Sequence, residues 1–139
     1  MIKLILVIFL ALLLRLYNLG QSFWLDEAAQ VIESARPLNE QLNIGADFHP
    51  PLYHLLLHFW MYLGNSEIWI RLLSVGLGLG VVFITYKTAK LLFSENVALV
   101  SSFLVAISPY LIWYSQEARP YILFVFLSLI STFFLLKKN

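Results

Sequence analysis

The chain has 139 residues, of which 60% are hydrophobic and 12% are charged, and its formal net charge is +1. Soluble domains average about 45–50% apolar and about 25% charged residues, so this composition excludes an ordinary soluble domain as well as a disordered chain. The near-neutral charge excludes a basic surface for nucleic acid, and because cysteine is absent, disulfides, thiolate metal sites and cysteine nucleophiles are excluded too.

Four apolar runs predict membrane-spanning helices, and they cover residues 2–19, 68–91, 97–114 and 120–136. Each run, in part with flanking residues, approaches the ~20 residues that cross a ~30 Å hydrocarbon core. The predicted fold is therefore an all-α membrane protein with about four transmembrane helices, forming a single module over residues 1–139. The first run could also be a signal peptide, but Arg15 interrupts it and no small-x-small cleavage site follows.

A fifth apolar segment, 52–63, predicts a helix over 51–63 that lies in the membrane interface, because the twelve apolar-segment residues reach only about 18 Å. His54 and His58 share one face of this helix and are expected to face headgroups and water. With this segment on the surface, the lysines gather on one side of the membrane and the acidic residues of the long loop on the other. The sequence thus predicts a multi-pass protein of the cell membrane with both termini in the cytoplasm.

The predicted outer loop, 20–67, carries an acidic pair where a short helix over about 24–35 begins. Asp26 and Glu27 lie in the first turn, where acidic side chains compensate the positive end of the helix dipole. This stabilising role alone would account for the presence of both acids. A carboxylate beside Trp24 at the membrane surface would instead have its pKa raised toward that of a general base. Because neighbours on a helix point about 100° apart, we expect only one of the two to face a site.

Asp47 and His49 form a second polar group, on an extended segment before Pro50 and Pro51. Carboxylate and imidazole groups are competent ligands for a divalent ion, and the adjacent helix start also favours a phosphate. A capping Asp and an interfacial His are the alternative. Two potential ligands are too few to establish a metal site from spacing alone.

The predicted outer turn, 115–119, places Glu117 and Arg119 between two buried helices. An arginine at the membrane boundary can hold a lipid phosphate in a bidentate fork, although snorkelling or a local ion pair would also account for it. Arg15 and Arg71 also lie near the outer ends of their spans, where snorkelling is the default. We therefore expect a site for a lipid-linked phosphate on this face, with Arg119, Glu117 and Arg71 around it.

Five segments in order carry a resemblance to a known family: 14–20 (LRLYNLG), 24–28 (WLDEA), 49–53 (HPPLY), 71–74 (RLLS) and 114–121 (YSQEARPY). They resemble the N-terminal part of the GT-C polytopic glycosyltransferases, of the group similar to protein-O-mannosyltransferases and the aminoarabinose transferase. The resemblance implies transfer of a sugar, with inversion, from a polyprenyl-phosphate donor at the outer membrane face. Since family members have many more spans, the chain is expected to match an N-terminal portion, with the rest of such an enzyme as a partner.

The resemblance also implies roles for individual residues. Asp26 matches the acidic residue that deprotonates the acceptor hydroxyl, and Glu27 completes the acidic pair. His49 lies where aminoarabinose transferases carry a metal-binding Glu, so a divalent metal ion near the donor phosphate is the one cofactor expected. Arg119, with Glu117 beside it, would hold the phosphate as it leaves. The alternative is a non-catalytic membrane fragment or accessory subunit that binds lipid or partner helices.

Overall fold

The computed structural model describes residues 2–41 and 50–138, and this part of the chain consists of helices joined by turns and loops, without strands. The prediction of an all-α protein is thus confirmed. The helices are α1 (Ile2–Leu16), α2 (Leu25–Ser34), α3 (Leu38–Gln41), α4 (Leu52–Met61), α5 (Glu67–Leu92), α6 (Glu95–Ala106), α7 (Pro109–Ser115) and α8 (Tyr121–Lys138).

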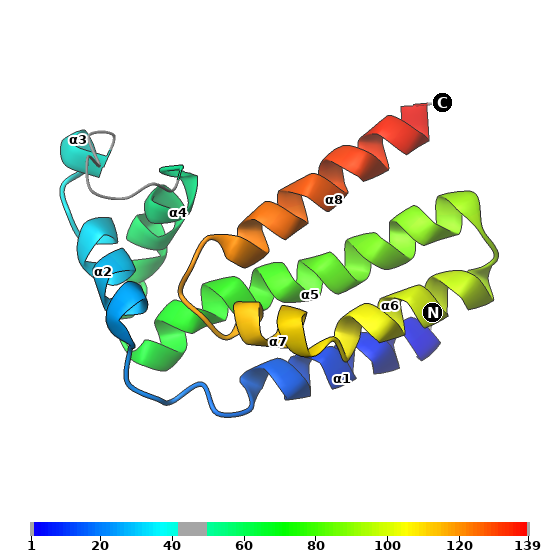
Figure 1. Cartoon of the computed structure of the whole chain (residues 1–139), viewed down its shortest axis with the longest axis horizontal. Coiled ribbons are helices and arrows are strands. Elements are labelled where there is room, and N and C mark those ends of the chain that lie inside the picture. Colours follow the sequence, from blue (N-terminus) through cyan, green and yellow to red (C-terminus); the bar gives the residue numbers. More distant parts are fainter. Residues whose placement is uncertain (1, 42–49, 139) are drawn as a thin grey trace.

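The long helix α5 forms the axis of the molecule (Figure 1). It packs against α1, α6, α7 and α8, and α1 also lies along α6. The short helices α2, α3 and α4 form a separate group beside one end of α5, with α2 packed on α4. This group is built from the polar segment that the sequence predicts as an outer loop.

Two helices, α5 and α8, are long and apolar enough to cross a membrane. The bent pair α6 and α7 adds a third span if it is counted as one. Helix α1 has 15 described residues and ends at Leu16, three residues before the predicted end. It ends there because 17–20 form a turn in which Asn18 takes a φ of 64°, a left-handed conformation that Asn tolerates better than most residues. Its length of about 22 Å is short for a ~30 Å core.

The segment 97–114, predicted as one span, consists of two helices with a 60° bend between them. The bend lies before Pro109, whose ring fixes φ and whose missing N–H is harmless at the first position of a helix. Ser108 before it is extended, as the residue before a proline prefers to be. The break leaves the last carbonyls of α6 without helical partners, so a donor from elsewhere can bind them.

Helices α2 and α4 are joined by polar contacts rather than by apolar packing alone. The His54 Nδ1 atom lies 2.7 Å from the Gln30 amide nitrogen, and the His58 Nδ1 atom lies 2.8 Å from the Ser34 carbonyl oxygen. The expectation that His54 faces headgroups and water is wrong, because its side chain is fully buried against α2. The histidine face of α4 is thus the face that packs on α2, and apolar residues such as Phe59 are exposed instead.

Candidate functional site

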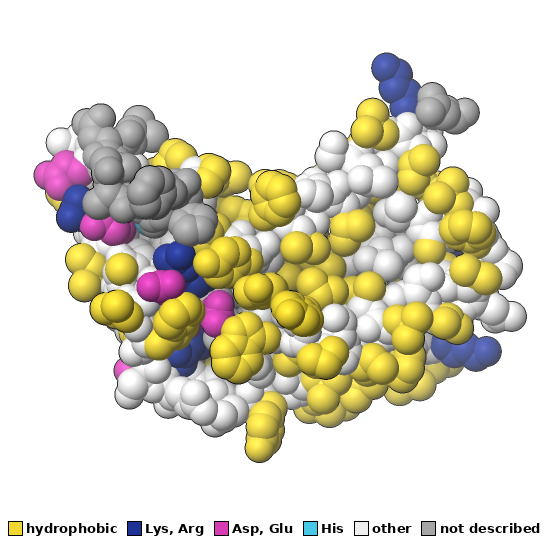
Figure 2. Space-filling model, in the orientation of Figure 1, with side chains coloured by type: hydrophobic (Ala, Val, Ile, Leu, Met, Phe, Trp, Pro, Cys, Tyr) yellow, Lys and Arg dark blue, Asp and Glu magenta, His cyan; other side chains and the backbone are white. Residues whose placement is uncertain are grey.

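The first turn of α2, the start of α5 and the turn between α7 and α8 meet at one end of the bundle. Figure 2 shows acidic and basic side chains close together on the surface over this junction. Of the five sequence-predicted site residues that the structure describes, four are buried: Glu27, Arg71, Glu117 and Arg119. The site is therefore a partly desolvated cluster of charges at the edge of an apolar bundle, where each charge needs a partner.

The centre of the cluster is an ion pair between Glu27 and Arg71. The Arg71 Nε atom donates to Glu27 Oε1 at 2.9 Å, and Nη2 donates to Oε2 at 2.6 Å, so the pair is bidentate. The two residues are 1% and 4% exposed. The Ala118 backbone N–H also donates to Glu27 Oε1 at 2.8 Å, which fastens the α7–α8 turn to α2.

The remaining N–H groups of Arg71 are occupied as well. They donate to the carbonyl oxygens of Leu19, Gln21 and Ser22 at 2.6, 2.5 and 3.4 Å. The snorkelling interpretation of Arg71 is therefore wrong, because the side chain turns inward and holds the loop after α1. In this geometry no N–H of Arg71 is left for a donor phosphate, and Glu27 is turned away from solvent. The Glu27–Arg71 pair therefore has a structural role, because it holds the loop after α1 and the α7–α8 turn against α2.

Asp26 and Arg119 are two further charged residues of the cluster. Asp26 is half-buried, and its backbone carbonyl accepts a hydrogen bond from Arg119 Nη1 at 3.2 Å. The guanidinium of Arg119 lies 5.6 Å from the centre of the Tyr121 ring. Its Nε atom is buried and has no hydrogen-bond partner in the described part of the chain. An arginine with an unused N–H beside a half-exposed acid is the arrangement expected around an anionic group.

Glu117 lies in the same turn and is 7% exposed. Burial raises the pKa of the Glu117 carboxyl above its ordinary value, and the negative charges of Glu27 and Asp26 raise it further. A hydrogen bond with the Trp113 side chain and the positive charge of Arg119 oppose this rise without cancelling it. The structure therefore brings Asp26, Glu117 and Arg119 close together.

Sequence reasoning missed the contacts between α1 and the segment that leads into the α7–α8 turn. Arg15, expected to snorkel, is fully buried and donates to Ser115 Oγ at 3.2 Å and to the freed Ala106 carbonyl at 3.0 Å. In return, the Gln116 amide nitrogen donates to carbonyls at the end of α1, the shortest bond being 2.7 Å to Tyr17. The charge inside an apolar run was the only signal for this arrangement, and it did not reveal the partners.

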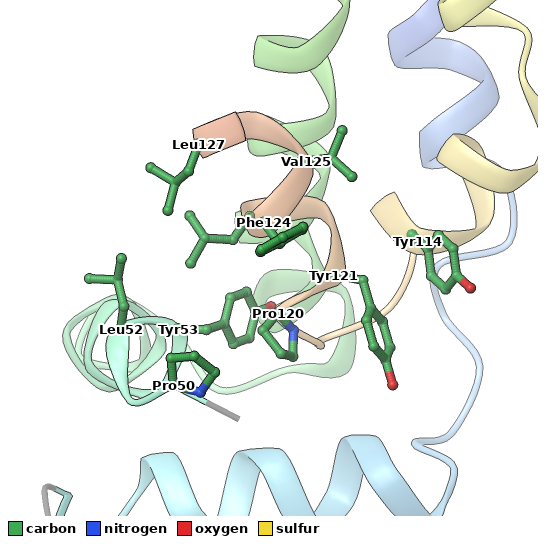
Figure 3. A pocket seen from close by; sticks show the side chains of 10 residues that line it. Pro50, Leu52, Tyr53, Tyr114, Pro120, Tyr121, Phe124, Val125 and Leu127 are labelled. Carbon is green, nitrogen blue, oxygen red and sulfur yellow. The ribbon is translucent and has the colours of Figure 1, made fainter. Parts of the chain in front are cut away.

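Two cavities adjoin the cluster. One, which we call the aromatic hollow, has a volume of about 610 Å³ and is lined in part by Tyr17, Asn18, Trp24, Trp113, Glu117 and the Glu27–Arg71 pair. The other, the apolar groove, has a volume of about 370 Å³ and lies between α4 and α8. Figure 3 shows its side chains, with Leu52 and Tyr53 from α4 opposite Phe124 and Leu127 from α8.

The predicted metal ligands Asp47 and His49 lie outside the described residues. Within 2–41 and 50–138, no group of three or more His, Asp or Glu side chains could hold a metal ion. A metal site on Asp47 and His49 therefore stays a prediction.

Comparison with known proteins gives one match. The model of the family described as dolichyl-phosphate-mannose-protein mannosyltransferase matches residues 48–139, which is more than half of the chain. The match contains Arg71, Glu117 and Arg119, whereas Asp26 and Glu27 precede it. No curated protein and no solved structure matches the chain. By the extent of the family match, and with an all-helical structure that contains membrane-length helices, the chain belongs to the dolichyl-phosphate-mannose-protein mannosyltransferase family of membrane glycosyltransferases.

Proposed function

We propose that this chain carries part of the active site of an enzyme that transfers a sugar from a polyprenyl-phosphate donor to an acceptor hydroxyl. The observation that carries the proposal is the juxtaposition of Asp26, Glu117 and Arg119 at the end of an apolar groove, in a chain of this family. A base and an anion-binding group side by side are the two elements that such a displacement needs.

In the proposed reaction the acceptor oxygen attacks the sugar carbon while the bond from that carbon to the phosphate oxygen breaks. The acceptor proton passes to the Asp26 carboxylate, and the polyprenyl phosphate leaves with the bonding electron pair. Arg119 stabilises the negative charge that builds on the phosphate, through the Nε–H that is unused in the structure. A single displacement of this kind inverts the configuration at the sugar carbon.

The apolar groove between α4 and α8 suits the lipid part of the donor. Its lining is apolar apart from the tyrosine hydroxyls (Figure 3). The ring of Tyr121, a lining residue, lies 5.6 Å from the guanidinium of Arg119. An isoprenoid chain in the groove would bring its phosphate close to Arg119. Burial of apolar chain stabilises binding by about 25 cal/mol per Å² removed from water.

Glu117 is a second candidate for the base. Its raised pKa brings it closer to the range in which a carboxyl group both accepts and returns a proton at neutral pH. Asp26 is the more exposed of the two and is therefore the first choice. Comparison of the Asp26→Asn and Glu117→Gln enzymes identifies the base, because only loss of the base removes the corresponding limb of the pH–rate profile.

The proposal includes a divalent ion near the donor phosphate, with Asp47 and His49 as its ligands on this chain. Carboxylate and imidazole groups suit such an ion, which would add positive charge beside the leaving phosphate. We expect EDTA to lower transfer, Mn²⁺ or Mg²⁺ to restore it, and His49→Ala to weaken the restoration. Full activity in EDTA would remove the metal from the proposal.

We further propose that the site faces the outside of the cell membrane and that both termini are cytoplasmic. The lysines at the far ends of α5 and α8 support this orientation, because positively charged residues favour the cytoplasmic side. The charged cluster lies at the opposite end of α5, where Arg71 is in the first two turns.

The test is transfer from a radiolabelled polyprenyl-phosphate sugar in membranes that contain the complete enzyme. Asp26→Asn and Arg119→Ala should each lower the rate constant by about 10²–10⁴-fold, the usual contribution of a general base or of an oxyanion-type donor. Glu40→Gln, an exposed acid on α3, is the matched control and should stay within twofold of wild type. Wild-type transfer by the Asp26→Asn enzyme would reject the proposal and favour an accessory, non-catalytic chain.

A further inference from the structure

We propose that the aromatic hollow binds an uncharged sugar ring of the acceptor. This inference rests on the proposed function, because it names the class of acceptor that the same site would use. The hollow adjoins the charged cluster through Glu117 and through the Glu27–Arg71 pair in its wall. Its volume of about 610 Å³ is within the range of small-molecule sites, roughly 300–1,000 Å³.

Three aromatic side chains from separate segments line the hollow without being buried. Tyr17 follows α1, Trp24 precedes α2 and Trp113 belongs to α7, and their exposed fractions are 78%, 47% and 64%. Aromatic side chains with an apolar face and a polar edge are suited to ligands that are themselves apolar on one face and polar around the rim. A pyranose ring has this character, because its axial C–H groups form a face while its hydroxyls surround it.

Polar groups between these rings can hold the hydroxyls of such a ring. Glu117, which carries a carboxyl group, and Asn18, which carries a side-chain amide, are both among the lining residues of the hollow. Between them they offer hydrogen-bond acceptors and donors, as hydroxyl recognition requires. Asn18 is placed there by the left-handed turn that ends α1, a conformation that few side chains other than Asn accept.

The charged residues of the hollow disfavour a phosphate as its occupant. Glu27 and Glu117 both line it, and every N–H of Arg71 is already bound to Glu27 or to a backbone carbonyl. Arg119, with its unused Nε–H, is not part of the lining. Because the Glu27 charge is compensated by Arg71, a phosphate in the hollow would meet the acid Glu117 and find no free N–H of Arg71 to bind it, so the charge distribution assigns the hollow to the acceptor and the Arg119 side to the donor.

The aromatic residues could instead serve as an interfacial belt that contacts lipid headgroups, which is common at membrane boundaries. An aromatic residue of such a belt contacts lipid whether or not it lines the hollow, whereas a sugar-binding residue must line the hollow. Tyr110 therefore provides a matched control, because it lies on α7 near Trp113, is 75% exposed and does not line the hollow.

The experiment measures binding of three probes to the complete Asp26→Asn enzyme in nanodiscs. The probes are a methyl mannoside, a short oligosaccharide, and a Ser/Thr-containing peptide without sugar, each followed by saturation-transfer NMR and titration. We expect the oligosaccharide and the mannoside to bind, and Trp113→Ala to weaken binding about tenfold, which corresponds to ~1.4 kcal/mol. Trp113→Phe keeps a ring but loses the hydrogen bond with Glu117, so it should retain most of the affinity, and Tyr110→Ala should match the parent.

Three results would overturn the inference: equal binding by the Trp113→Ala and parent enzymes, binding of the peptide but not of the sugars, or displacement of the sugars by the polyprenyl-phosphate donor. The last would assign the hollow to the donor. Failure of the proposed function is separate, because it appears as transfer that survives Asp26→Asn, whatever the sugar affinities are.

Discussion

Breaking the buried ion pair between Glu27 and Arg71 should be among the most damaging changes in this chain. Arg71→Met removes the partner of a carboxylate that is 1% exposed and leaves the carbonyls of Leu19, Gln21 and Ser22 without their donor. Removal of one member of a buried pair typically costs about 3–5 kcal/mol, because the other charge stays behind without compensation. We expect a loss of this size in the free energy of unfolding.

The double variant separates the charge effect from the loss of packing. Glu27→Gln with Arg71→Met leaves no isolated buried charge, so its cost should be well below the sum of the two single costs. Arg71→Lys keeps the charge but loses the two-pronged geometry and should be intermediate. The assay is unfolding by SDS in mixed micelles, followed by tryptophan fluorescence. Costs of the single variants below about 1 kcal/mol, or costs that simply add, would refute the reasoning.

Three further predictions concern packing, pH and orientation. Gly78→Ala should destabilise the fold by roughly 1–3 kcal/mol in the same unfolding assay because a Cβ there overlaps a neighbouring side chain, whereas Gly76→Ala, which meets open space, should be neutral or slightly stabilising. Because folding raises the pKa of Glu117, the folded chain binds the carboxyl proton more tightly than the unfolded chain does. The free energy of unfolding should therefore fall as pH rises through the interval above 4.5, and Glu117→Gln should remove this pH dependence. Arg36 and Lys87 are both exposed and can each be replaced by a single cysteine. The cysteine at position 36 should react with an impermeant maleimide from outside, whereas the one at position 87 should react only after permeabilisation. The reverse pattern would overturn the proposed orientation.

The sequence by itself determined the helical class and most helix positions. The observed α2, α4, α5 and α8 lie within two residues of the predicted ranges, because apolar runs, acids at helix starts and prolines act over a few neighbouring residues. The same local signals placed Asp26 and Arg119 in polar segments between apolar runs.

Only the tertiary structure decided which charged side chains are paired with partners inside the fold and which keep unused hydrogen-bonding groups. Glu27 and Arg71 are 44 positions apart, and Arg15 and Ser115 are 100 apart, so no periodicity in the sequence connects them. A buried arginine must satisfy its N–H groups with whatever acceptors the fold brings near, and those acceptors are mostly backbone carbonyls, which every residue carries alike. The apolar content of 60% predicted a membrane protein, but long-range packing alone turned Arg15 and Arg71 inward and left Arg119 Nε without a hydrogen-bond partner in the described part of the chain.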